Sequence, residues 1–171
     1  VLMALAEEED NQESATAWLL ECAELYRTKI ERPEDARKAY GKVLDFQPTD
    51  PLALDGIASL LETTEHRNHY CERLAKAGAQ EEDSQQKAQF LSNLATLRME
   101  LGHPSDSVIE ALVDALDAWP KLEDSARRLC SLYERVIDPR GHAEALFRLY
   151  QATSDPLEQA GALLKRGKIL W

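Results

Sequence analysis

The sequence repeats itself at an interval of about 72 residues, and this repeat restricts the fold more than any other feature. A shift of that length places Leu19 on Leu91 and then on Leu163. It also places Ala23 on Ala95. Internal repeats are typical of solenoids, in which each copy packs on its neighbours along the chain. The 171 residues therefore hold a little more than two copies of a stacked unit.

Apolar residues within each copy recur three or four positions apart, as in Leu19, Cys22, Ala23 and Tyr26. This is the spacing of one face of an α-helix, not of a strand. Glycine and proline number only seven each, which also favours helices. The sequence predicts an all-α fold with nine helices, at residues 13–30, 33–46, 51–64, 67–78, 84–101, 104–118, 122–137, 140–152 and 156–171.

Prolines, acids and glycines mark the ends of several helices. A proline in the first turn sacrifices no hydrogen bond, and an aspartate before it can cap the helix. We expect these roles for Pro33, Pro104 and Pro139 and for the pairs Asp50-Pro51 and Asp155-Pro156. We expect Gly102 to end a helix, and Gly56 and Gly167 to lie where helices pack closely.

Short loops between consecutive helices predict antiparallel hairpins. We expect a single solenoid segment of about four and a half hairpins, at 13–48, 51–78, 84–120 and 122–152, with an unpaired last helix at 156–171. The acidic connection at 79–83 is predicted to be the most mobile joint. Because the sequence stops inside an apolar helical pattern, we interpret the chain as a fragment of a longer polypeptide.

The chain is acidic, with 31 Asp and Glu against 20 Lys and Arg and a net charge of −11. Such a surface repels phosphate backbones and anionic lipids and attracts basic partners, so we expect neither nucleic acid nor membrane as partner. No apolar run approaches the roughly 20 residues of a membrane span. The three cysteines form no C-x-x-C pair, which favours a reducing compartment and a cytoplasmic location.

Sequence motifs give no support to catalysis or to a bound cofactor. No nucleophile elbow, phosphate loop or H-E-x-x-H motif occurs. His66, His69 and Cys71 could suggest a zinc site, but a structural site needs four ligands and no second cluster follows. We therefore expect no metal and no enzyme, with Cys71 as a small buried residue.

The repeats resemble the tetratricopeptide family, whose unit is a helix hairpin of about 34 residues, close to half of this interval. The best match runs from Gln89 to Pro120, where Leu91, Leu94 and Ala95 stand at the large, large and small positions of the first helix. The pattern is degenerate elsewhere: Arg98 and Ala111 occupy positions that are usually aromatic in the family.

The resemblance implies a right-handed superhelix that acts as a protein-interaction scaffold. In this family the first helix of each hairpin lines a concave groove that holds a peptide or a helix of another protein. By that register the groove residues are Glu24, Arg27, Asp55, Ser59, Glu62, Ser92, Thr96, Met99, Arg127, Ser131, Glu134 and Lys168. Two alternatives stay open, an RNA-binding helical repeat and a regulatory or spacer arm of a larger enzyme. The apolar face of the last helix also predicts self-association.

Overall fold

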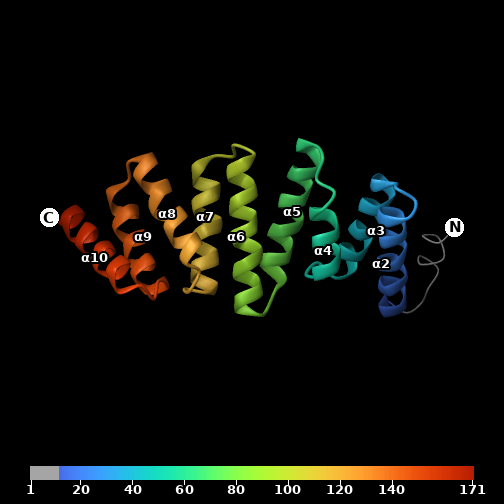
Figure 1. Cartoon of the computed structure of the whole chain (residues 1–171), viewed down its shortest axis with the longest axis horizontal. Helices are drawn as coiled ribbons and strands as arrows, with labels where there is room; N and C mark the ends of the chain where they lie inside the picture. Colours follow the sequence, from blue (N-terminus) through green and yellow to red (C-terminus); the bar gives the residue numbers. More distant parts are fainter. Residues whose placement is uncertain (1–11) are drawn as a thin grey trace. The chain divides into compact units, whose positions relative to one another are not determined.

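A computed structural model describes residues 12–171, which form nine α-helices and no strand (Figure 1). The all-α class is confirmed. The helices are α2 (Gln12–Thr28), α3 (Pro33–Phe46), α4 (Pro51–Ala58), α5 (Thr64–Gln80), α6 (Ser84–Glu100), α7 (Ser105–Ala118), α8 (Glu123–Val136), α9 (Pro139–Ala152) and α10 (Pro156–Leu170). None of the helices in this described range combines the length and hydrophobicity that a membrane crossing requires.

The interval of 72 residues is preserved in the helix boundaries. Moved by that interval, α2 and α3 coincide at both ends with α6 and α7. The first residues of α4 and α6 likewise coincide with those of α8 and α10. The repeat in sequence is therefore a repeat of helices, and residues 72 apart occupy equivalent helical positions.

The chain divides into two compact units, one ending at Gln80 and the other spanning Glu81–Trp171. The boundary lies inside the acidic connection at 79–83. Helix α6 begins directly after it, where the Asp83 carboxylate accepts hydrogen bonds from the backbone N–H groups of Gln85 and Gln86 at 3.0 and 2.8 Å.

In the first unit, α2 and α3 form a hairpin, and α4 packs chiefly on α3 and only marginally on α5. Its core is built from Leu19 and Cys22 of α2, Tyr40 and Leu44 of α3, and Leu74 of α5, all buried. Asp50 caps α4, with its carboxylate 2.8 Å from the Ala53 N–H, and Pro51 occupies the first turn as expected.

The helix expected at 51–64 is shorter in the structure, because α4 ends at Ala58. The Ser59 N–H still bonds to the Asp55 carbonyl, but the Leu60 N–H turns to Ile57 and tightens the last turn. Thr63 then starts α5 earlier than the predicted residue 67, since its hydroxyl oxygen accepts from the His66 N–H at 3.2 Å. The threonine at position 63 was the available signal in the sequence, because threonine is a common N-cap residue.

In the second unit, α6 pairs with α7 and α8 pairs with α9. Gly102 ends α6 as expected, with φ of +72°. The N–H of Gly102 bonds to the Met99 carbonyl and that of His103 to the Arg98 carbonyl, which is a Schellman motif. Arg98, which departs from the family pattern, donates from Nη1 to the Ser107 carbonyl of α7 at 2.6 Å.

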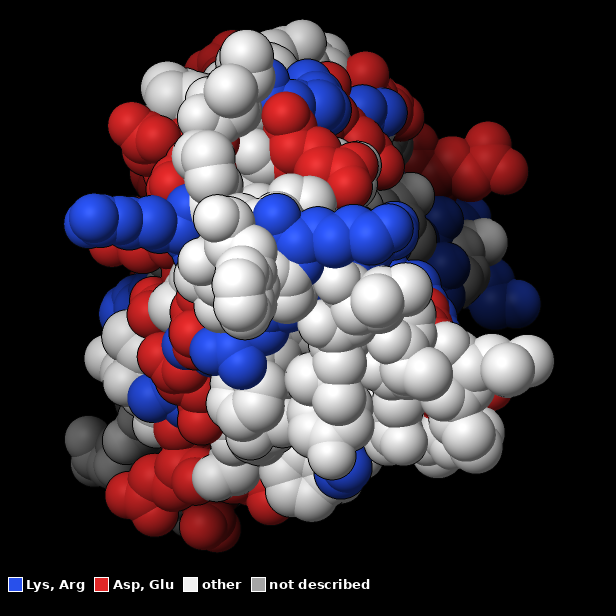
Figure 2. All heavy atoms as spheres, turned by 90° about the vertical axis from the view of Figure 1, so that its left-hand side faces the viewer, with Lys and Arg blue, Asp and Glu red and all other residues white. Residues whose placement is uncertain are grey.

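Helix α10 packs extensively on α9. Of its residues only Ala162 is buried, and the Arg166 guanidinium lies 4.7 Å from the centre of the Phe147 ring. Four leucine side chains of α10 are exposed to solvent: Leu157, Leu163, Leu164 and Leu170. Figure 2 looks toward this end of the unit and shows a broad area of uncharged residues crossed by Lys and Arg side chains.

Two local expectations differ from the structure. Pro104 lies one residue before α7, at the N-cap position and not in the first turn. A Cβ at Gly167 would meet no atom within 4 Å, so this glycine marks no close helix contact. Pro33 and Pro139, by contrast, do occupy first turns.

Candidate functional site

An open bay of about 520 Å³ lies between α2 and α4 of the first unit. We call it the α2–α4 bay. It is lined by Leu20, Glu21, Glu24, Arg27, Tyr40, Leu52, Asp55, Gly56 and Ser59. Four of these, Glu24, Arg27, Asp55 and Ser59, belong to the groove set that the sequence predicts. The structure therefore brings together a third of the predicted residues in one hollow.

The floor of the bay depends on the contact between Gly56 of α4 and Tyr40 of α3. A Cβ atom at Gly56 would lie 2.4 Å from Cζ of Tyr40 and within 2.7 Å of both Cε atoms. Only glycine therefore lets α4 approach the ring without a shift of one or the other. The close helix contact expected of Gly56 is confirmed, and it places an aromatic surface beneath the bay.

A hydrogen-bonded triad of Glu24, Arg27 and Tyr40 forms one wall. Arg27 donates from Nη2 to Oε2 of Glu24 at 2.7 Å and from Nε to Oε1 at 3.3 Å. The buried Tyr40 hydroxyl donates to the same Oε1. The hydrogen bonds from Arg27 and then from Tyr40 lower the pKa of Glu24, whereas burial and then Glu24 raise the pKa of Tyr40 to about 12. At neutral pH this wall holds a paired anion and a neutral phenol.

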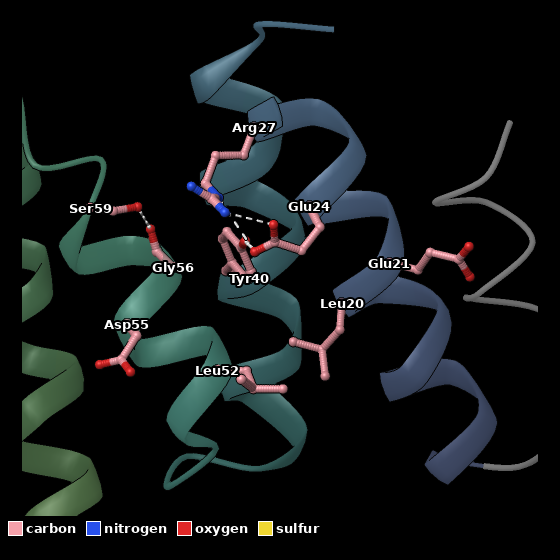
Figure 3. Close-up of a pocket in the computed structure, with 9 residues that line it drawn as sticks. All are labelled: Leu20, Glu21, Glu24, Arg27, Tyr40, Leu52, Asp55, Gly56 and Ser59. Atoms are coloured by element: carbon pink, nitrogen blue, oxygen red, sulfur yellow. Dashed lines mark hydrogen bonds and ion pairs between the residues drawn. The ribbon is translucent and has the colours of Figure 1, made fainter. Parts of the chain in front are cut away.

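Figure 3 shows how the other side chains point. Leu20 and Leu52 extend into the space between the two helices, next to Tyr40. Glu21 and Asp55 point away from that space, one outside α2 and the other outside α4. The bay thus has an apolar interior, with Leu52 65% exposed, between two carboxylate rims.

The second unit fills the equivalent position with its own side chains. The interval of 72 places Leu20 on Ser92, Glu24 on Thr96 and Gly56 on Arg128. Arg128 reaches from α8 to α6 and donates from Nη1 to the Thr96 hydroxyl. The Ser92 hydroxyl lies 2.9 Å from that of Ser125 on α8. The repeat position that is open between α2 and α4 is therefore bridged between α6 and α8.

The remaining predicted groove residues have varied surroundings. Arg127 bonds to three carboxylates, those of Glu123, Asp124 and Glu158. Oε1 of Glu134 lies 3.3 Å from Nε2 of His142. Ser92 and Thr96 belong to the bridge just described. The rest, Glu62, Met99, Ser131 and Lys168, are exposed.

A second cleft, of about 930 Å³, lies between α3 and α5, at residues that the repeat register does not single out. Charged side chains dominate its lining, and most are paired: Arg73 bonds to Asp45 at 2.5 Å, and Arg37 bonds to Glu34 and to the Leu60 carbonyl. His66 and His69 lie on its wall. No cluster of three or more His, Cys, Asp or Glu side chains suited to a metal ion occurs within residues 12–171. Cys71 is buried, as expected.

Comparison with known proteins gives matches in three-dimensional structure only, because neither a family model nor a curated protein matches the sequence. The MamA protein superimposes with a TM-score of 0.55 at 19% identity, over 91% of this chain and 90% of its own. A tetratricopeptide repeat protein from Parabacteroides merdae superimposes with a TM-score of 0.57 at 13% identity, over 91% of this chain and 60% of its own. PilF from Pseudomonas aeruginosa superimposes with a TM-score of 0.54 at 14% identity, over 99% of this chain and 82% of its own.

Proposed function

Because the chain has the fold of tetratricopeptide repeat proteins, we propose that it is a protein-interaction scaffold and that the α2–α4 bay holds a segment of its partner. The observation that carries this proposal is the bay itself. It lies between the first helices of two neighbouring hairpins, and these helices line the binding groove in the family that the sequence resembles.

The size and lining of the bay support binding. Its volume of about 520 Å³ falls within the roughly 300–1,000 Å³ that is typical of ligand pockets. Such pockets combine apolar walls with a few fixed polar groups. Leu20, Leu52 and the Tyr40 ring supply the apolar part, and the Glu24 carboxylate, held by Arg27 and Tyr40, supplies the fixed polar part.

The hydroxyl groups in the bay favour binding over catalysis. Ser59 donates from its hydroxyl to the Gly56 carbonyl of its own helix at 2.7 Å. The Tyr40 hydroxyl donates to Glu24, and its pKa is raised to about 12. A nucleophile needs a lowered pKa or a base that takes its proton. Ser59 faces a carbonyl, and the carboxylate that accepts from Tyr40 is a weak base because hydrogen bonds from Arg27 and Tyr40 lower the pKa of Glu24. Both hydroxyls therefore serve as positioned polar groups.

Site-specific photo-cross-linking tests the proposal. A benzoylphenylalanine at Leu52 reports on the bay, and one at Lys38 reports on the cleft between α3 and α5, because each residue is exposed and lines one of the two. In an extract of the source cell, we expect one partner to be labelled from position 52 and not from 38. The reverse pattern, or equal labelling from both positions, would count against the bay.

Matched substitutions separate binding from folding. Leu52→Glu places a charge in the apolar interior and should abolish capture of the cross-linked partner. Lys38→Glu, also at an exposed position of the first unit, should leave capture unchanged. Because both residues are exposed, the circular dichroism spectrum and melting temperature of both variants should match those of the parent protein. If only Lys38→Glu loses capture, the partner binds in the cleft between α3 and α5 and not in the α2–α4 bay.

A further inference from the structure

We propose that the α2–α4 bay selects a basic protein segment in which one long apolar side chain is flanked by Lys or Arg residues. The proposal rests on the function proposed above and adds the chemistry of the partner. The apolar side chain would enter between Leu20 and Leu52, and the flanking bases would meet Glu21 and Asp55 on the two rims.

The interior of the bay defines the central side chain. Leu20 and Leu52 present carbon surface, and a partner's apolar group would remove this surface from water at a gain of about 25 cal/mol per Å². A polar side chain entering between Leu20 and Leu52 would have to give up its water against side chains that offer no hydrogen bond. Burial of an apolar residue is therefore favoured.

The second unit shows how the gap between first helices is closed in another copy of the repeat. At the equivalent position Arg128 extends from α8 as far as Thr96 on α6. In the first unit Gly56 replaces Arg128, and the Tyr40 ring lies against Gly56 and donates from its hydroxyl to Glu24, the counterpart of Thr96. The space for a partner's leucine or methionine therefore lies beside Tyr40, between Leu20 and Leu52.

The charges around the bay define the flanking residues. Among the lining residues within the described range 12–171, Arg27 is the one base, and its charge is paired with Glu24. Glu21 and Asp55 are exposed carboxylates on opposite rims, so the field at the entrance is negative. The net charge of −11 extends this field and favours encounter with basic segments. A base on either side of the apolar residue would complement both rims.

Three synthetic peptides test this chemistry by fluorescence anisotropy at about 50 mM salt. All have the same glycine–serine backbone and blocked ends. The first has a central leucine with lysines on both sides, the second has serine in place of the leucine, and the third has glutamates in place of the lysines. We expect the first to bind about tenfold more tightly than either of the others, and to weaken as salt rises.

Variants of equal charge show whether the bay is responsible. Glu21→Lys combined with Asp55→Lys should weaken the first peptide about tenfold. Glu72→Lys combined with Glu110→Lys changes the net charge by the same amount at exposed positions outside the bay and should have little effect. Leu20→Ser combined with Leu52→Asp installs the residues of the second unit, Ser92 and Asp124, and should remove the preference for leucine over serine.

Two results would overturn the inference: tighter binding of the glutamate peptide, or equal losses in both pairs of charge variants. The cross-linking at Leu52 distinguishes these from failure of the proposed function. If a partner cross-links there through an acidic segment, the bay is a binding site with different chemistry. If nothing cross-links at Leu52 and none of the three peptides binds, the proposed function and this inference both fail.

Discussion

Arg127 of α8 donates two hydrogen bonds to Glu158 of α10, from Nε to Oε1 at 2.7 Å and from Nη2 to Oε2 at 2.8 Å. The same guanidinium reaches Glu123 at 2.8 Å and Asp124 at 3.2 Å on its own helix. Such a two-point contact is among the stronger ion-pair geometries. Arg127, which the family register places in the groove, therefore joins the first helices of two successive hairpins.

This ion pair should make stability depend on pH in acid. The hydrogen bonds from Arg127 lower the pKa of Glu158 from 4.5 to about 2. A carboxyl whose pKa is lower in the folded state stabilises the fold above its unfolded pKa, and this contribution is lost as pH falls from about 4.5 to about 2. Glu158→Gln should therefore be less stable than the parent at pH 6 and equal to it at pH 2, in urea unfolding followed by circular dichroism.

Glu82→Gln is the control for that measurement, because Glu82 is an exposed carboxylate in the connection before α6. It should change stability little at either pH. If Glu158→Gln is less stable than the parent by the same amount at pH 2 as at pH 6, the loss of stability has a cause other than the lost ion pair.

Gly56→Ala should destabilise the first unit by about 1–3 kcal/mol, because the new methyl group would overlap the buried Tyr40 ring. Gly161→Ala is the matched control, since a Cβ there meets no atom within 4 Å inside a helix. That change should instead stabilise the protein by about 0.5–1 kcal/mol through helix propensity. Chemical unfolding of the two variants measures both effects, and a stabilised Gly56→Ala would contradict the described contact.

Ile137 ends α8 in the left-handed conformation, with φ of +56°, and is 84% exposed. A β-branched residue is strained in this region, at a cost of roughly 1–2 kcal/mol. Ile137→Gly removes the strain and loses little packing, so the free energy of unfolding should rise by about 1 kcal/mol after the greater freedom of glycine in the unfolded chain is allowed for. Val136→Gly, one residue earlier and within the helix, should lower stability instead.

The exposed leucines of α10 should cause self-association that depends on concentration. Leu164 is 63% exposed and Leu170 is 62% exposed. Apolar patches of this kind associate between copies when nothing covers them. Leu164→Glu combined with Leu170→Glu should shift sedimentation velocity profiles toward the monomer. Trp18→Glu, at an apolar residue of the first unit that is 50% exposed, should not, and an equal shift would exclude α10 as the contact.

The helices could be predicted because their signals are local. Apolar spacing of three and four fixes which face is buried, and Asp50, Asp138 and Asp155 all cap the helix that follows them. The end of α4 at Ala58 was missed because the residues that follow it do not break the apolar pattern. The turn there is stabilised by particular hydrogen bonds of Ser59 and Leu60, which spacing alone does not reveal.

Predicting the site was harder, because it depends on which side chains cross the gap between helices. The family register identified four residues of the α2–α4 bay, and it treated Thr96 and Arg127 in the same way. Only the structure shows that Thr96 meets Arg128 and that Arg127 meets Glu158. One signal was present in the sequence, since the repeat aligns Gly56 with Arg128, a residue with no side chain against one of the longest.

The cap on α6 has a practical meaning for experiments. Asp83 satisfies the first turn of that helix with a carboxylate from within the second unit. A protein chemist can therefore cut the coding sequence between Gln80 and Glu81 without removing the N-terminal cap of α6. The two halves could then be produced apart, and each assayed for its own ligands.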